Sequence, residues 1–140
     1  MTFLDSNILL RHVLKDDPIQ SPASRSLIQA IEQGRVTVWT SDLTVAEVVW
    51  VLSNKRTYNL PREQIRDALL PLIDLPHLKL ARKRLYSRVF ELYTSLPIDY
   101  VDCYHAALLE RTSDPSIYSF DKDFDDIARI SRVEPTLGQR

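Results

Sequence analysis

Carboxylates far apart in the chain are the residues whose chemistry the sequence first suggests. Carboxylate oxygens are the ligands that Mg²⁺ and Mn²⁺ prefer, and several carboxylates in one place repel one another unless a cation or protons offset their charge. A metal held in this way lowers the pKa of a bound water and can orient it as a nucleophile. We predict that four acids supply this chemistry: Asp5, Glu47, Asp102 and Asp121.

Asp5 and Glu47 also have structural explanations. Asp5 is followed by two further capping residues where a strand is expected to become a helix, and such side chains bond free helix amides. Glu47 shares a helical face with Trp50 and Val51, so a freely solvated carboxylate is unexpected there. The alternative is a polar strip that faces water and consists of Thr44, Glu47 and Asn54.

Asp102 and Asp121 are each accompanied by a second acid. Asp99 is expected to cap the helix that contains Asp102, and at this spacing Asp99 can support Asp102 or replace it as a ligand. The N-terminus of that helix also stabilises an ionised carboxylate. Asp121 and Asp123 belong to one acidic run, for which a turn-and-cap cluster before a short helix is the structural alternative.

Histidine and cysteine supply neither a zinc site nor a nucleophile. The three histidines lack the spacing of zinc ligands, although His105 follows Asp102 closely. The single cysteine, Cys103, is expected to be buried and cannot form an internal disulfide, so a reducing compartment is the simpler assumption. A metal site built from carboxylate oxygens, without histidine or cysteine ligands, favours Mg²⁺ or Mn²⁺ over Zn²⁺.

Short β-like runs alternate with longer helical patterns, and Gly34 is predicted to end the second helix. Strands are expected at residues 2–4, 36–40, 78–80 and 116–120, and helices up to residue 14 and at 21–33, 43–55, 61–73, 82–95, 99–111 and 124–129. The helix at 43–55 is apolar almost all round and is expected to be mostly buried. This alternation predicts the α/β class, as a single-domain α/β/α sandwich over residues 1–140 with a central parallel sheet.

The predicted sheet is expected to place two of the acids at the same edge. Asp5 follows the first predicted strand and Asp121 follows the fourth. Parallel strands point the same way, and ligands bind beyond the carboxyl ends of such strands. Both acids are therefore expected at one edge of the sheet.

The net charge of −1 is unevenly distributed. Residues 77–94 contain five bases and one acid, a local +4, and residues 114–126 contain five acids and one base, a local −4. Separate patches of this kind can hold a polyanion and a cation, although each alone is also typical of a solvated surface. No signal peptide and no apolar run of membrane-spanning length is visible, which favours a cytoplasmic protein without membrane contact.

Four motifs in order resemble the PIN domain family and, more narrowly, the VapC-type toxins of toxin–antitoxin pairs. They read FLDSNIL, TVAEV, DYVDC and YSFDKDF and begin at Phe3, Thr44, Asp99 and Tyr118. The resemblance spans most of the chain. It departs after Asp102, where the family more often has small aliphatic residues and this chain has bulkier ones.

The resemblance assigns the acidic positions of the family to Asp5, Glu47, Asp102 and Asp121. Asn7 and Ser119 fall where the family often places small polar groups that support these acids. It further implies RNA cleavage with Mg²⁺ or Mn²⁺, a homodimer, and a small antitoxin that silences the toxin.

We therefore expect a metal-dependent endoribonuclease that acts as the toxin of a type II toxin–antitoxin system. The main alternative is a non-catalytic PIN-fold module that binds RNA or another protein. Aspartyl-phosphate phosphatases need a second Asp two positions after the first, where this chain has Asn7. A receiver-type signalling module needs an acidic pair near its first strand, where only Asp5 is present.

Overall fold

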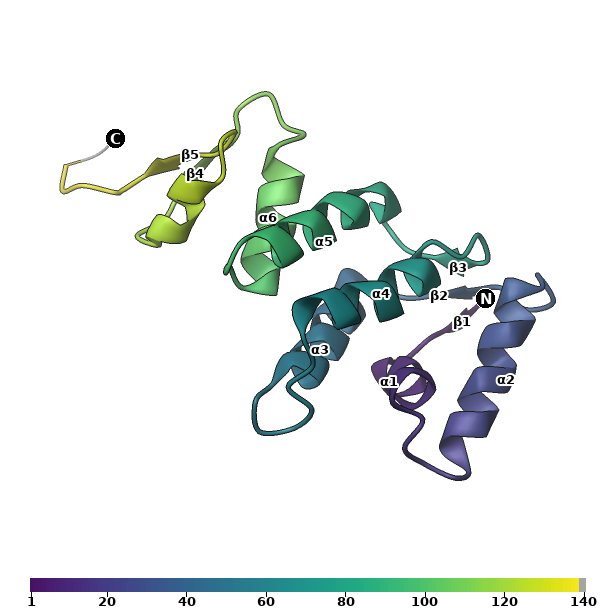
Figure 1. Ribbon diagram of the computed structural model, residues 1–140. Helices are drawn as coiled ribbons and strands as arrows, with labels where there is room; N and C mark the ends of the chain where they lie inside the picture. Colours follow the sequence, from purple (N-terminus) through teal and green to yellow (C-terminus); the bar gives the residue numbers. More distant parts are fainter. Residues whose placement is uncertain (139–140) are drawn as a thin grey trace. The chain divides into compact units, whose positions relative to one another are not determined.

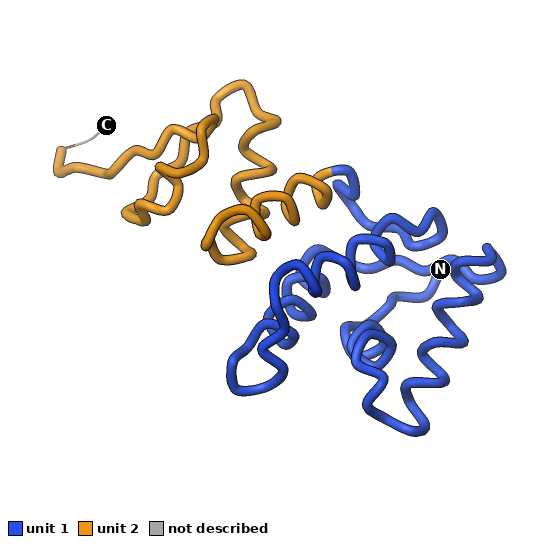
Figure 2. The backbone as a smooth tube through the Cα atoms, in the orientation of Figure 1, with its two compact units in different colours: residues 1–84 blue, residues 85–140 orange. Residues whose placement is uncertain are grey.

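The structure is a computed structural model that describes residues 1–138. The chain divides into two compact units, residues 1–84 and residues 85–140, which we call unit 1 and unit 2 (Figure 2). Both units combine helices with parallel strands, which confirms the predicted α/β class.

Unit 1 alternates strands with helices in chain order (Figure 1). Its elements are β1 (Thr2–Phe3), α1 (Ser6–Leu14), α2 (Gln20–Glu32), β2 (Val38–Trp39), α3 (Asp42–Ser53), α4 (Arg62–Ile73) and β3 (Leu78–Lys79). A 3₁₀ turn, η1 (Lys83–Leu85), follows and ends at the first residue of unit 2. The three strands form a parallel sheet in the order β1-β2-β3.

The two faces of this sheet differ. Successive strand residues point to opposite faces. Val38 and Leu78 are buried on one face, whereas Phe3 and Trp39 are exposed. The apolar core of unit 1 comes largely from the helices, and its fully buried members include Ile28, Ile31, Val48, Leu52 and Ile65.

The end of α2 is set by Gly34, as the sequence predicts. Gly34 adopts φ +73°, a left-handed conformation that side chains with a Cβ rarely accept. A Cβ at this position would also lie 3.0 Å from Nε2 of His77, which shares a 3.2 Å hydrogen bond through Nδ1 with the hydroxyl of Thr37. Glycine therefore permits both the turn and the close packing of the imidazole.

Unit 2 contains two helices, two strands and a 3₁₀ turn: α5 (Tyr86–Ser95), α6 (Tyr100–Leu109), β4 (Ser116–Tyr118), η2 (Lys122–Asp126) and β5 (Ser131–Val133). An aromatic cluster packs between α5 and α6, with the rings of Phe90 and Tyr100 5.8 Å apart. Arg88 of α5 binds both carboxylate oxygens of Glu110, at 2.8 and 2.9 Å, and so ties the end of α6 to α5.

Three predicted elements differ from the structure. The helix predicted at 82–95 begins only at Tyr86, because Arg82 adopts φ +54° and the next residues form η1. The short helix predicted at 124–129 is the 3₁₀ turn η2 instead. The helix predicted to be mostly buried is α3, yet Leu43 and Trp50 on its outer face are 77% and 64% exposed.

The strand β5 was not predicted, and it pairs in parallel with β4. The described strands therefore form two sheets, β1-β2-β3 in unit 1 and β4-β5 in unit 2. Asp5 follows β1 and Asp121 follows β4, so the expectation that both acids follow strands of one sheet is wrong. No helix in the described part of the chain is long and apolar enough to cross a membrane.

Candidate active site

Unit 2 holds a cluster of carboxylates around the first turn of α6, and we call Asp99, Asp102, Asp121 and Asp123 the acidic cluster. Asp102 is half-buried. Burial raises the pKa of the Asp102 carboxyl above its ordinary value, and the charges of Asp121 and Asp99 raise it further. Asp123 adds to this shift, whereas the nearby His105 opposes it.

The same repulsion acts on Asp123. The carboxylate of Asp121 is the largest cause of the raised pKa of Asp123, ahead of desolvation and of the charges of Asp126 and Asp99. Asp126, a further neighbour of Asp123, is not among the site residues expected from the sequence. Its place in the acidic run was the only available signal. The acids of this cluster are therefore close enough to disfavour one another's charged forms.

The turn after β4 fixes the backbone of Asp121. The backbone amide of Asp121 donates to the hydroxyl of Ser119 at 3.0 Å, and the amide of Asp123 donates to Oδ1 of Asp121 at 2.9 Å. The guanidinium of Arg132 donates to the carbonyl oxygen of Ser119 at 3.1 Å. One oxygen of Asp121 thus caps η2, as the structural explanation expects, and this turn leaves the second oxygen unused.

Asp99 occupies the N-cap position of α6 without making a side-chain capping bond. Asp102 lies in the first turn of the same helix, where the helix dipole favours an ionised carboxylate. The pKa of Asp102 is nevertheless raised, so burial and like charge outweigh the dipole at this position. A positive charge nearby would therefore stabilise the ionised form of Asp102.

Asp5 lies in unit 1 at the N-cap of α1, and its side chain makes no capping bond either. The end of β1 is held by two hydrogen bonds of 2.8 Å, from the amide of Leu4 to the carbonyl of Trp39 and from the buried hydroxyl of Thr40 to the carbonyl of Leu4. Asp5 and Asn7 are both exposed beside this anchored strand end. The carboxylate of Asp5 is therefore not explained by capping.

Glu47 lies on the exposed side of α3. Of the neighbours that were expected to shield it, Trp50 is itself exposed and Val51 is half-buried, and Leu43 on the same side is also exposed. The alternative of a polar strip is also not observed, because Thr44 is buried at the start of the helix, where its amide donates to the capping hydroxyl of Ser41. Glu47 is thus a solvated carboxylate flanked by two apolar side chains.

The structure brings together the four acids of unit 2, while Asp5 and Glu47 belong to unit 1. The donors are chemically right for a hard cation, and the repulsion at Asp102 is what a divalent ion relieves. Among residues 1–138, however, no three His, Cys, Asp or Glu side chains lie close enough together to hold a metal ion. Unit 2 therefore supplies suitable donors but not an assembled ligand set.

The cysteine lies as the sequence suggests, whereas His105, expected to be partly buried, is exposed. Cys103 is fully buried, and its thiol donates to the carbonyl of Ile98 at 3.6 Å, which confirms the expectation of a buried cysteine. His77 packs beside Gly34 in unit 1 and His105 is exposed one turn after Asp102 in unit 2.

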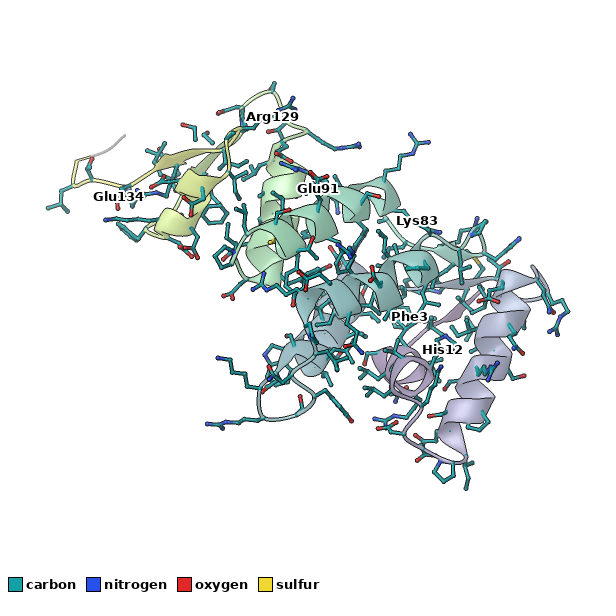
Figure 3. The ribbon with its side chains drawn as sticks, in the orientation of Figure 1. Phe3, His12, Lys83, Glu91, Arg129 and Glu134 are labelled. Atoms are coloured by element: carbon teal, nitrogen blue, oxygen red, sulfur yellow. The ribbon has the colours of Figure 1, made fainter. Side chains whose placement is uncertain are left out.

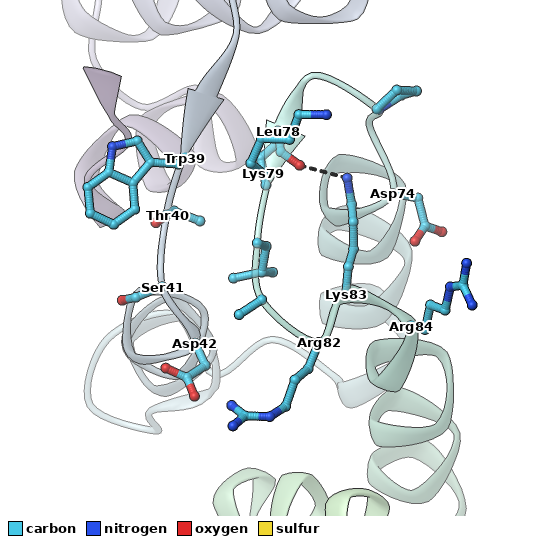
Figure 4. Close-up of a pocket in the computed structure, with 13 residues that line it drawn as sticks. Trp39, Thr40, Ser41, Asp42, Asp74, Leu78, Lys79, Arg82, Lys83 and Arg84 are labelled. Carbon is cyan, nitrogen blue, oxygen red and sulfur yellow. Dashed lines mark hydrogen bonds between the residues drawn. The ribbon is translucent and has the colours of Figure 1, made fainter. Parts of the chain in front are cut away.

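A pocket in unit 1 was not anticipated from the sequence. It has a volume of about 930 Å³ and lies beyond the carboxyl ends of β2 and β3 (Figure 4). Its lining includes Trp39 and four cationic side chains. The cations are part of the basic stretch that the sequence analysis noted, but nothing in the sequence placed Trp39 beside them.

Comparison with protein families gives a match to the family model described as PIN domain over residues 2–130. The match includes every acid discussed above. Comparison with curated proteins gives no significant match.

Proposed function

The chain belongs to the PIN domain family, and on that premise we propose that it is a metal-dependent endoribonuclease. PIN domains are typically nuclease modules that use divalent metals. The observation that carries the proposal is the carboxylate repulsion at Asp102, which burial strengthens and which a bound cation relieves.

In this proposal, units 1 and 2 form one PIN domain over residues 1–140, and their acids share one Mg²⁺ or Mn²⁺ site. Asp5 and Asp102 are the principal ligands, and Glu47 and Asp121 hold further metal or water. The ion, when bound, supplies a water of lowered pKa and positive charge for the phosphate. No side-chain nucleophile is required.

The remaining residues of the site position these carboxylates. Ser119 accepts from the amide of Asp121, so it holds the turn on which Asp121 lies. Asp99 and Asp123 keep the local potential negative, which strengthens the attraction for a divalent cation. Asn7, exposed in the first turn of α1, is proposed to support Asp5.

We also propose the narrower role that the motifs suggest. The chain would act in the cytoplasm as the toxin of a type II toxin–antitoxin system, as a homodimer that a small antitoxin silences. The resemblance of its four motifs to VapC-type toxins supports this role. A gene for a small DNA-binding antitoxin beside the gene for this chain would add direct support.

A second candidate is a non-catalytic module of the same fold that binds RNA or a protein. One observation favours it, namely that residues 1–138 contain no assembled group of three metal-binding side chains.

Incubation of the purified chain with structured RNAs and Mg²⁺ or Mn²⁺ separates the two candidates. The nuclease proposal predicts cleavage that a chelator stops and that Asp5→Asn and Asp102→Asn both abolish. Asp114→Asn is the matched control, since Asp114 is an exposed acid of unit 2 outside the acidic cluster. Cleavage that survives the chelator or both substitutions would exclude the mechanism. RNA binding without cleavage would favour the second candidate.

A further inference from the structure

The pocket in unit 1 combines an aromatic side chain with positive charge. Lys79, Arg82, Lys83 and Arg84 line it, against two acids, Asp42 and Asp74 (Figure 4). The acids are engaged locally, because Asp42 accepts from the amide of Leu43 at 3.0 Å and Asp74 interacts electrostatically with Lys83. The lining of the pocket therefore carries a net positive charge.

Lys83 has a structural role in this pocket. Its ammonium group, on the side chain labelled in Figure 3, donates to the carbonyl oxygens of Leu75 and Leu78. The bond to Leu78, at 2.7 Å, is drawn in Figure 4. Burial lowers the pKa of Lys83, as expected for an ammonium group that has lost part of its water. Lys83 thus fixes the segment after β3 and is not available to a ligand.

The other three cations are available. Lys79, Arg82 and Arg84 are exposed. Their side chains make no hydrogen bond or ion pair with any group in residues 1–138. Arg11, by contrast, is paired with Asp16 at 2.7 Å. Three unpaired cations around one hollow are suited to phosphate groups, which Lys and Arg bind without regard to base sequence.

Trp39 lies next to Lys79 on the exposed face of the sheet. The two residues are in register on β2 and β3, so their side chains leave the same face about 5 Å apart. Phe3, in register on the other side, contacts the indole edge-to-face at a ring distance of 4.7 Å. Trp39 is 45% exposed, so Phe3 braces the indole while leaving much of it open to a ligand.

We propose that the surface formed by Trp39, Lys79, Arg82 and Arg84 binds a single-stranded segment of RNA, and we call it the stacking surface. A base stacks on the indole, and the flanking phosphates pair with the cations. A base in a duplex is already stacked on both faces, so only an unpaired nucleotide can make both contacts. The inference deepens the proposed ribonuclease function on which it rests, because it specifies unpaired RNA as the form of substrate bound.

Tryptophan fluorescence tests this proposal. The chain has two tryptophans, so Trp50→Phe leaves Trp39 as the reporter, and Asp102→Asn is added to stop cleavage. The probe is an oligouridylate about ten nucleotides long, titrated in the presence of Mg²⁺. We expect quenching of Trp39, and we expect affinity measured by anisotropy to fall about tenfold on Trp39→Leu.

Charge variants and matched controls sharpen the test. Lys79→Gln is expected to lower affinity and to reduce the salt dependence of binding by about one unit of slope. Lys15→Gln removes the same charge from an exposed site of unit 1 outside this pocket, and it is expected to change neither quantity. Trp39→Phe keeps an aromatic face and is expected to restore most of the affinity that Trp39→Leu loses.

The outcomes separate this inference from the nuclease proposal. Absence of quenching, affinity of Trp39→Leu equal to that of its parent, or equally tight binding of duplex RNA would overturn the stacking surface. If the unmodified chain still cleaves RNA in that case, the nuclease proposal stands. If the unmodified chain cleaves nothing but Trp39 is quenched as expected, the stacking surface stands and the nuclease proposal fails.

Discussion

At the scale of single residues, Asp102 combines two unfavourable conditions for a charged carboxylate. It is half-buried, and other carboxylates of the acidic cluster lie near it. A residue that binds an ion or a substrate often makes the folded protein less stable than a neutral residue at the same position would. The ionised carboxylate of Asp102 is therefore expected to lower the stability of the folded protein when no cation is bound beside it.

We expect Asp102→Asn to raise the free energy of unfolding near neutral pH by up to about 1 kcal/mol, since an amide carries neither the partly buried charge nor the repulsion. The pKa of Asp102 is raised in the folded protein, so the folded state binds a proton more tightly than the unfolded state. The free energy of unfolding of the wild-type chain therefore falls as pH rises through the pKa of Asp102 in the folded protein, and that of Asp102→Asn does not. Below about pH 3 the wild-type carboxyl is protonated in both the folded and the unfolded state, so the variant is no longer the more stable one.

Urea denaturation at acidic and neutral pH measures this gain. Asp114→Asn, outside the acidic cluster, serves as the control and is expected to change stability little at either pH. A loss of stability in Asp102→Asn near neutral pH would show that the carboxylate has a structural partner instead.

Gly34 shows how one residue controls a turn. Its φ of +73° and the 3.0 Å approach to His77 predict that Gly34→Ala lowers the free energy of unfolding by about 1–2 kcal/mol. Gly138 has a similar φ of +77° but no atom within 4 Å of its Cβ position, so Gly138→Ala isolates the backbone effect near the chain end. Equal effects of the two substitutions would contradict a steric role for His77.

At the scale of elements, the ion pair between Arg88 and Glu110 fastens α6 to α5. The Glu110 side chain is only 9% exposed. The Arg88 guanidinium is the largest cause of the lowered pKa of the Glu110 carboxyl. We therefore expect Glu110→Gln to lower the free energy of unfolding near neutral pH by about 1–2 kcal/mol.

The pH dependence of this effect has a defined sign. Because the pKa of Glu110 is depressed in the folded protein, its contribution is complete above the unfolded value of 4.5 and is lost as pH falls through the folded value. Denaturation of the variant and the wild type should therefore converge in acid. Glu91→Gln, at the more exposed partner of Arg88, should have a smaller effect, and a larger one would contradict this account.

The elements that could be predicted from the sequence are those with local signals. Gly34 ended α2, and Pro61 preceded α4, which begins at Arg62. The predicted helix at 82–95 was too long at its start because the positive φ of Arg82 depends on the turn that Lys83 fixes through carbonyls of the preceding segment. The strand β5 was missed because its three residues are defined by pairing with β4 rather than by their own pattern.

At the scale of the whole molecule, the sequence could suggest a set of candidate acids but not all of their surroundings. Asp102 and Asp121, which were expected in one site, do lie near each other in unit 2, whereas the predicted strand ends had joined Asp121 to Asp5 instead. The exposure of Glu47 was not anticipated, because apolar neighbours in a helix do not reveal whether another element covers them. The pairing of Trp39 with Lys79 likewise depends on strand register, which no local pattern of the sequence encodes.

The account of function depends on the acids of both units sharing one ion. Mn²⁺ binding, followed by electron paramagnetic resonance in the purified full chain, tests this dependence without requiring a substrate. Asp5→Asn in unit 1 and Asp102→Asn in unit 2 are expected each to weaken Mn²⁺ binding about tenfold or more, while Asp114→Asn binds as the wild type does. Wild-type affinity for Mn²⁺ in either Asp5→Asn or Asp102→Asn would contradict a centre built from both units.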